Sequence, residues 1–479
     1  MTVLATALTV IAIVTQDQVP LRAAPRESAA QQAVLWQGDS LEIRGSKGDY
    51  LQVYDHRRER TGYLRASQVR RQALEPENAP ELLAVVRFLH DTPGAEALGI
   101  SYAAAYLKAA PAEAIDGEIF AALGTFAERL ARRATVRQGK MPDTTVGAHL
   151  EVAAAYGVSM VSFERDDQVQ LCYQGDAFRR VLALPANDVQ KALAALALTR
   201  HDCLSPTLMP VERFAVDHWR VEVLDRVETS KLSEVLKNRL RLRKAGVWAS
   251  LAWQRARRPE LGSGPVVEAA SRALSELAAI NRSELAESDA AAYSDAAVRV
   301  GASRWAAEPG PPVSPTKVSA GLGIATTPGQ PGETCVHLVD AQHSVRKPLL
   351  TRCTYGVVWA ASAAAHPQGT ALTLAVQPLD TWREMWVFRQ GPAGWVVDVV
   401  PPATDQPHLG YLEFAGWVPG GTQMLAAREA KVDGRYKLSF ELMNLSRLEV
   451  ERWADKPASL TAFHRWQTPS WKAKTVSIR

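Results

Sequence analysis

The chain has 479 residues, more than one hydrophobic core usually supports, so about two to four domains are expected. Hydrophobic residues make up 47% and charged residues 22%, which excludes a disordered or fibrous chain. A formal net charge of +4 over this length is too small to indicate a nucleic-acid-binding protein.

The first predicted feature is an apolar run over residues 3–14. It is too short for a stable membrane span, which takes roughly 20 residues, but it has the length of the apolar core of a signal peptide. No Lys or Arg precedes the run, and no small-x-small cleavage site stands ahead of Gln16. Two interpretations stay open: residues 1–15 are an export segment, which we favour, or the run is a buried first strand.

Residues 16–72 are expected to form a small β-barrel. Short stretches with alternating apolar positions recur through this segment, and glycine-containing and charged turns separate them. The stretches are residues 34–36, 41–43, 50–53 and 62–64. Short strands broken by glycine and charge at this density are typical of a barrel.

The order of residues in this segment also resembles the bacterial SH3 family. The matching features are Val19-Pro20-Leu21-Arg22 with Pro25, the turn Gly38-Asp39-Ser40-Leu41, the strand Tyr50-Leu51-Gln52-Val53, and Gly62-Tyr63-Leu64, where Tyr63 replaces the Trp of the family's Gly-Trp-Val signature. The resemblance implies an envelope module that binds peptidoglycan, a peptide or another domain. It makes the tyrosines Tyr50, Tyr54 and Tyr63 the candidate ligand-binding residues.

The strongest basic cluster of the chain lies in the same segment and comprises Arg57, Arg58, Arg60, Arg65, Arg70 and Arg71. It is interrupted by Glu59 and has no stacking aromatic residues at regular intervals. We interpret it as a solvated edge of the barrel, with contact to an acidic polymer as the alternative.

Residues 75–305 are predicted to be mainly helical, with one β element at 158–184. Within that element, alternation on both sides of Asp166-Asp167 indicates a hairpin, and residues 178–184 are predicted as a third strand. From 208 to 305 the pattern is helical throughout, including one long stretch over 223–247.

A proline-rich linker at 306–316 precedes a β-repeat domain at 317–479. Aligned to itself at an offset of 52, this domain matches without gaps, so that Pro367-Gln368-Gly369-Thr370 falls on Pro419-Gly420-Gly421-Thr422. Each of the two full units is predicted to have four strands, with a partial unit before them and a weaker one from Ser459. The turn resembles the blade turn of TolB-like and other propellers, and closure into a ring is left open. The predicted fold class is therefore multidomain α+β.

The four cysteines predict two disulfides in an exported chain. Proximity in sequence favours Cys172–Cys203 and Cys335–Cys353. The alternative, a metal site shared with His201 and His337, is disfavoured because neither His-x-Cys pair has the ligand spacing of a structural zinc site.

No motif of a catalytic nucleophile, a phosphate-binding loop or a zinc protease is present in the sequence. His149 is interpreted as a surface residue, and His366 and His464 as hydrogen-bonded structural residues in or beside the first strand of a repeat unit. The predicted function is that of a non-enzymatic periplasmic protein that binds peptidoglycan or an envelope protein partner, without metal or cofactor. The alternative is a cell-wall hydrolase that its SH3-like module brings to the substrate.

Overall fold

The computed structural model describes residues 10–137, 140–141, 143–165, 168–308, 321–404, 409–469 and 471–472. The chain forms two compact units. The first runs to Met209 and includes Arg226–Leu232, and the second comprises Pro210–Asp225 and the chain from Ser233 onward. The region 75–305, predicted as one helical domain, is therefore divided between the two units.

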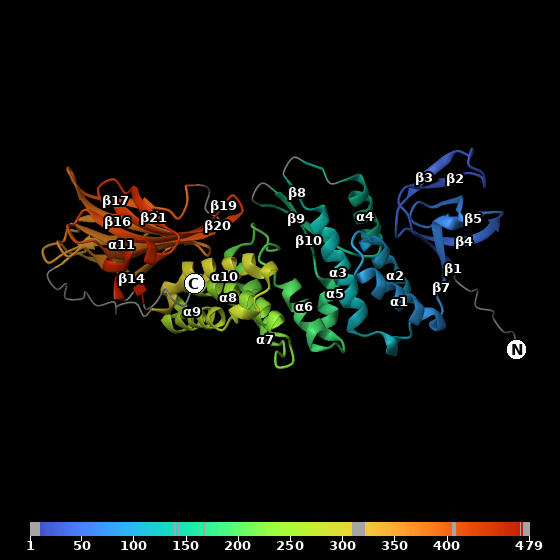
Figure 1. The fold of residues 1–479 in the computed structure, drawn as a ribbon, viewed down its shortest axis with the longest axis horizontal. Helices are drawn as coiled ribbons and strands as arrows, with labels where there is room; N and C mark the ends of the chain where they lie inside the picture. Colours follow the sequence, from blue (N-terminus) through green and yellow to red (C-terminus); the bar gives the residue numbers. More distant parts are fainter. Residues whose placement is uncertain are drawn as a thin grey trace. The chain divides into compact units, whose positions relative to one another are not determined.

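An antiparallel sheet of seven strands opens the first unit, with the strand order β3-β2-β6-β5-β4-β1-β7 (Figure 1). The strands are β1 (Val10–Val14), β2 (Val19–Arg22), β3 (Gln31–Leu35), β4 (Ser40–Lys47), β5 (Tyr50–Asp55), β6 (Arg60–Arg65) and β7 (Val69–Ala73). The alternating apolar residues Leu21, Leu51, Val53 and Leu64 are buried together on one face. This is the outcome that period-2 alternation dictates when one face of a sheet is covered.

Strand β1 lies inside this sheet, between β4 and β7. Its residues Ala12, Ile13 and Val14 are fully buried. The second half of the apolar run therefore forms a buried first strand, which is the second of the two interpretations left open by the sequence. Residues 1–9 lie outside the described part of the chain. Loss of residues up to 15 would remove a strand that two others pair with.

Among the described residues, six α-helices and a small three-stranded sheet complete the first unit. They are α1 (Ala79–His90), α2 (Glu96–Ala109), α3 (Gly117–Ala134), α4 (Thr144–Ala155), α5 (Asp176–Ala183) and α6 (Asp188–Leu198), with β8 (Val136–Arg137), β9 (Met160–Arg165) and β10 (Gln168–Tyr173). Helix α3 is central, because it contacts α1, α2, α4 and α5. The predicted hairpin is confirmed as β9 and β10, and its Asp166-Asp167 turn lies outside the described residues.

The third strand predicted at 178–184 is wrong, because this segment is most of helix α5. Ala177, Phe178 and Val181 are its buried residues, a spacing that places them on one side of a helix. Gly175, at φ +88°, precedes the helix in a conformation that glycine adopts without strain. The short apolar run was ambiguous between strand and helix, and packing against α3 decides for the helix.

In the second unit the helices are α7 (Pro210–Asp225), α8 (Glu234–Ala256), α9 (Ser263–Ala278) and α10 (Ala290–Ser303), followed by the short 3-10 helix η7 (Arg304–Ala307). The long helix predicted over 223–247 is interrupted between Asp225 and Glu234, where the Ser233 side chain accepts a hydrogen bond from the Leu236 N–H and caps α8. Among the described residues, no helix combines the length and the apolar character that crossing a bilayer requires.

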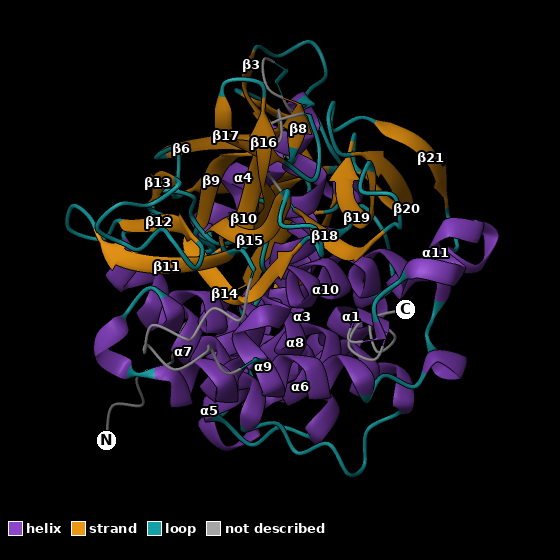
Figure 2. Cartoon of the chain, turned by 90° about the vertical axis from the view of Figure 1, so that its left-hand side faces the viewer, coloured by secondary structure: helices purple, strands orange, loops and turns teal. Residues whose placement is uncertain are grey.

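Two β-sheets follow the helices. A three-stranded sheet contains β11 (Gly323–Pro328), β12 (Thr334–Val339) and β13 (Leu350–Thr354). An eight-stranded sheet contains β14 (Val357–Ala365), β15 (Ala371–Leu379), β16 (Trp382–Gly391), β17 (Gly394–Val400), β18 (Gly410–Trp417), β19 (Gln423–Val432), β20 (Arg435–Asn444) and β21 (Val450–Ala454). Helix α10 contacts β16 and β18 of the larger sheet (Figure 2).

The period of 52 is visible in the larger sheet. Strand β15 begins at Ala371 and β19 at Gln423, which is 52 positions later. An irregularity in the first strand of each unit also recurs, since Ala364 pairs with Thr373 and Gly416 with Leu425 at the same offset. The two sets of four strands meet through a short parallel pairing of β16 with β18, so they form one sheet.

The weaker repeat unit predicted from Ser459 is wrong. Its residues form the helix α11 (Thr461–Trp466), and His464 lies on that helix rather than beside a strand. Phe463 of α11 is fully buried against Phe440 of β20 and Trp471, so this aromatic cluster holds a helix against the sheet. Most of the predicted linker at 306–316 lies outside the described residues.

Candidate functional site

The three candidate tyrosines lie on one face of the N-terminal sheet. Leu51 and Val53 of β5 point into the core, so Tyr50 and Tyr54 of the same strand lie on the opposite face. Tyr63 of β6 pairs with Gln52 of β5, which also belongs to that opposite face. We call the surface formed by Tyr50, Gln52, Tyr54 and Tyr63 the tyrosine face.

Charged residues alternate with the aromatic rings across the tyrosine face. Directly opposite each tyrosine stands a charged residue: Arg65 pairs with Tyr50, Glu42 with Tyr54, and Arg22 with Tyr63. Cross-strand partners share a face of the sheet, so these side chains and the rings lie side by side. The result is a surface with aromatic, cationic and anionic groups across the four neighbouring strands β2, β6, β5 and β4.

The tyrosines differ in how much ring they offer to solvent. Tyr50 is only 8% exposed, and the Arg65 guanidinium lies 5.6 Å from its ring centroid. Tyr54 and Tyr63 are partly exposed. Of the three candidates, Tyr54 and Tyr63 therefore carry the accessible aromatic surface.

A small charged network fixes the orientation of Tyr54. The Arg44 guanidinium stacks 4.0 Å from the Tyr54 ring centroid, and the His56 ring meets the same ring edge-on at 4.8 Å. Both neighbours also contact Glu42, His56 through Nε2 at 2.8 Å and Arg44 through Nε at 3.3 Å. The hydrogen bonds from Arg44 and His56 lower the pKa of the Glu42 carboxyl.

The basic cluster is only partly a solvated edge. Arg58 is 19% exposed and pairs with Asp55 at 2.8 Å, while Arg57 reaches Glu151 of α4 at 3.3 Å. Arg70 and Arg71 are exposed on β7. The arginines of the 57–60 turn are thus engaged in contacts within the unit, which leaves less free positive surface than the sequence indicates.

His149, interpreted as a surface residue, is buried at 2% exposure. Its Nε2 lies 2.8 Å from Asp17 Oδ1, in the segment between β1 and β2. The surface interpretation is wrong because the N-terminal sheet covers this side of α4. His366, by contrast, has the predicted hydrogen-bonded role, since its Nδ1 accepts from the Gln368 N–H at 3.2 Å.

Both predicted disulfides, Cys172–Cys203 and Cys335–Cys353, are present. The first joins β10 to the segment after α6, and the second joins directly opposed residues of β12 and β13. The alternative of a metal site is wrong, because the two sulfurs of each cysteine pair are bonded to each other. The His337 ring contacts two threonine hydroxyls instead, those of Thr327 at 2.8 Å and Thr351 at 2.9 Å.

The sequence did not reveal a buried charged cluster in the second unit. Glu413 of β18 accepts from Arg304 Nε at 2.8 Å and from Arg383 Nη2 of β16 at 2.7 Å, and all three side chains are almost completely buried. Within the described residues, Nε and Nη1 of Arg383 have no hydrogen-bond partner. Burial lowers the pKa of Arg304 to about 10, and burial together with Arg304 lowers that of Arg383 well below its usual value.

A second buried cluster surrounds Asp217 of α7. Its carboxylate accepts from Arg220 Nη1 at 2.6 Å, from Arg213 Nε at 2.8 Å and from Gln254 Nε2 of α8 at 2.6 Å. Burial raises the pKa of Asp217, but the two arginines outweigh burial and the pKa is lowered. The adjacent His218 turns to the Phe214 carbonyl instead, as expected for neighbours on a helix.

The Arg304–Glu413 pair joins residues 109 positions apart, and no local sequence pattern marks it. In the other cluster Arg213, Asp217 and Arg220 are close in sequence on α7, whereas Gln254 comes from a distant segment. A cavity lies beside the Arg304–Glu413 pair, and its lining residues come from several separate segments. Compared with known proteins, the chain matches no family model, no curated protein and no solved structure.

Proposed function

We propose that this chain is a non-enzymatic interaction protein of the cell envelope that binds peptidoglycan through the tyrosine face. The observation that carries the proposal is the placement of Tyr54 and Tyr63 on one face of neighbouring strands, each directly opposite a charged residue. An envelope protein is the other class of partner for the same face.

The chemistry of the face suits a charged polysaccharide. Tyrosine rings offer large, rigid, amphipathic surfaces against which sugar rings can lie. Guanidinium groups such as those of Arg22 and Arg65 pair with carboxylates, and peptidoglycan presents both sugars and the carboxylates of its peptides. Two disulfides support an exported, periplasmic location, where thiols are oxidised.

The finer architecture belongs to the same proposal. We infer that the seven-stranded sheet is an SH3-like barrel of the bacterial type, on the strength of the residue order that resembles that family. We infer likewise that the two four-stranded sets of the second unit are blade-like repeats. Both would make the chain an assembly of binding modules, an argument from analogy of fold.

Co-sedimentation with purified peptidoglycan tests the proposal on the full chain. The wild-type chain should pellet with peptidoglycan, and Tyr54→Ala with Tyr63→Ala should weaken binding by about tenfold or more, since two aromatic contacts are lost. The matched control is Tyr355→Ala, which removes a tyrosine that is 54% exposed in the second unit.

Two results would contradict the proposal, and each would favour a different function. Absence of pelleting by the wild-type chain would remove peptidoglycan as the ligand and leave a protein partner. Release of soluble muropeptides by the wild-type chain, measured by mass spectrometry, would replace the proposal by the cell-wall hydrolase.

A further inference from the structure

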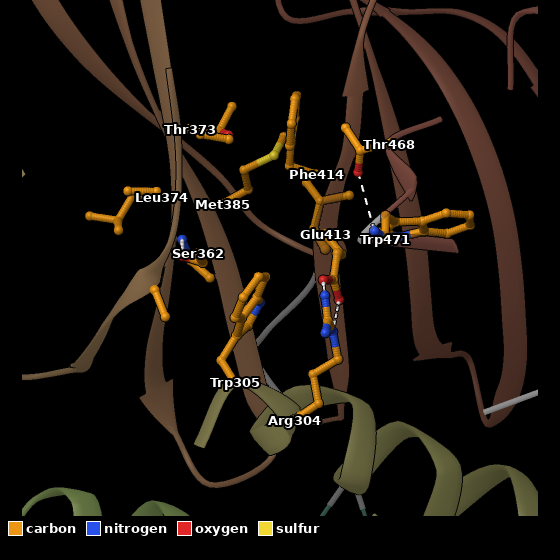
Figure 3. A pocket seen from close by; sticks show the side chains of 15 residues that line it. Arg304, Trp305, Ser362, Thr373, Leu374, Met385, Glu413, Phe414, Thr468 and Trp471 are labelled. Atoms are coloured by element: carbon orange, nitrogen blue, oxygen red, sulfur yellow. Dashed lines mark hydrogen bonds and ion pairs between the residues drawn. The ribbon is translucent and has the colours of Figure 1, made fainter. Parts of the chain in front are cut away.

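A cavity of about 140 Å³ in the second unit lies between the two repeat units (Figure 3). Strands β14 and β15 of the first repeat line one side of it, and β18 of the second repeat lines the other. Arg304 and Trp305 of η7 border it at one end, and Thr468 and Trp471 reach it from the C-terminal segment.

The walls of the cavity are apolar and polar in nearly equal measure. Met385 and Phe414 contribute the large apolar side chains, and Ala361, Ala363 and Ala364 leave space on β14. The volume is close to that of an apolar protein cavity that holds one benzene molecule, about 150 Å³. A single six-membered ring with a small substituent is therefore the size class that fits.

Polar groups also face this space. The Thr373 side chain is completely buried and lines the cavity, and its hydroxyl has no hydrogen-bond partner among the described residues. The indole N–H of Trp471 is also buried, and it too has no hydrogen-bond partner among the described residues. The Arg304–Glu413 ion pair closes one end.

These groups indicate what a ligand must supply. The indole N–H can only donate, whereas the Thr373 hydroxyl can donate or accept, so an acceptor on the ligand suits both groups. Leaving a buried donor unpaired costs free energy, which a ligand oxygen would recover. A ligand with acceptor oxygens is thus favoured over one with donors only.

The internal repeat allows an independent test of whether the fold itself requires the Thr373 hydroxyl. The residue equivalent to Thr373 in the second repeat is Leu425, 52 positions later, and it is fully buried in an apolar cluster with Phe463 and Trp471. The repeated strand therefore accepts an apolar residue at this position. Its fold does not require the hydroxyl that the first repeat places in the cavity.

We propose that this cavity is a binding site for a small aromatic molecule that carries an acceptor group such as a carboxylate. The ring lies against Met385 and Phe414, and the oxygen accepts from the Thr373 hydroxyl. This site is separate from the tyrosine face, and its occupancy does not depend on peptidoglycan binding.

Ligand-observed ¹⁹F NMR with the full chain and 4-fluorobenzoate tests the proposal. The wild-type chain should broaden the fluorine signal, and unlabelled benzoate should reverse the broadening. 4-Fluorobenzylamine has the same ring with a cationic donor group, so it should bind at least about tenfold more weakly. Equal binding of the two molecules would overturn the requirement for an acceptor.

Two variants locate the site. Thr373→Val removes the hydroxyl at almost constant volume and should weaken 4-fluorobenzoate binding by about tenfold. Thr373→Leu installs the residue of the second repeat and should abolish binding, because it also fills space. Thr326→Val, the same chemical change at an exposed position of β11, should bind as the wild type does.

The thermal transition of each variant checks that it is folded, and Thr373→Val keeps the test decisive if Thr373→Leu does not fold. No broadening by the wild-type chain at millimolar 4-fluorobenzoate would overturn the proposal. Unchanged binding by folded Thr373→Val would overturn the assignment to this cavity.

Discussion

The hydroxyl of Tyr156 donates a hydrogen bond to the carbonyl oxygen of Gly38 at 2.9 Å, across 118 positions of the chain. Tyr156 follows α4, and Gly38 lies in the turn before β4, so the bond ties the N-terminal sheet to the helices of the first unit. The same hydroxyl contacts Ser101 Oγ of α2 at 2.8 Å. The Gly38-Asp39 turn is therefore a docking point as well as a connection between strands.

Gly38→Ala should destabilise the first unit by about 2–3 kcal/mol, because a side chain there is strained in two ways. Gly38 has φ +92°, and a Cβ atom would lie 2.6 Å from the carbonyl oxygen of Ala97. Urea unfolding followed by circular dichroism measures the change. Gly48→Ala is the control, because Gly48 also has a positive φ of +58° but a Cβ atom there would have no other atom within 4 Å. This substitution should lower the free energy of unfolding by only about 1 kcal/mol. Equal losses for both variants would contradict the docking role of Gly38.

Loss of the Cys172–Cys203 disulfide should lower the free energy of unfolding of the first unit by about 3–4 kcal/mol. The bond spans 31 positions and restricts the unfolded chain, and it holds the segment after α6 against β10. Cys172→Ala with Cys203→Ala, compared with the wild type in urea, measures the effect. The control is the corresponding pair at Cys335 and Cys353, which should affect the second unit and leave the transition of the first unit in place.

The sequence predicts those features of the molecule that residues close together in the chain determine. It does not predict features that depend on contacts between distant segments. The strands of the repeat follow from local alternation, and β15 and β19 start at Ala371 and Gln423, which are separated by the predicted offset of 52. The cysteine pairs follow from proximity. Residues 178–184 were misassigned because a short apolar run fits a strand or a helix, and only packing against α3 distinguishes them.

The same contrast between local and long-range determination applies to the candidate sites. The three tyrosines of the N-terminal sheet are predicted from the resemblance to the bacterial SH3 family, and the strand periodicity of two places Tyr50 and Tyr54 on one face. The Arg304–Glu413 pair joins residues 109 positions apart, and the cavity beside it adds Trp471 from the end of the described chain. No periodicity connects such residues, so only the folded structure reveals them.

The buried carboxylate of Asp217 should make the stability of the second unit depend on pH. Its pKa in the folded chain lies below the ordinary value of 3.8, because Arg220 and Arg213 outweigh the effect of burial. A carboxyl with a lowered pKa contributes stability that is fully present above pH 3.8 and is lost as the pH falls through the folded-state pKa.

Asp217→Asn should therefore destabilise the second unit by about 3–5 kcal/mol at pH 7, since it leaves buried arginines without their counter-charge. The difference from the wild type should shrink as the pH falls below 3.8, where the wild type loses the same ionised carboxylate. Urea unfolding at a series of pH values measures this convergence.

The control is Asp225→Asn, which removes a 41% exposed carboxylate paired with Lys244 at 2.8 Å and should cost less than about 1 kcal/mol. A difference between Asp217→Asn and the wild type that stays constant down to pH 2 would show that the loss comes from hydrogen-bond geometry rather than from charge. A loss no larger than that of Asp225→Asn at pH 7 would show that the buried cluster does not depend on this carboxylate for its stability.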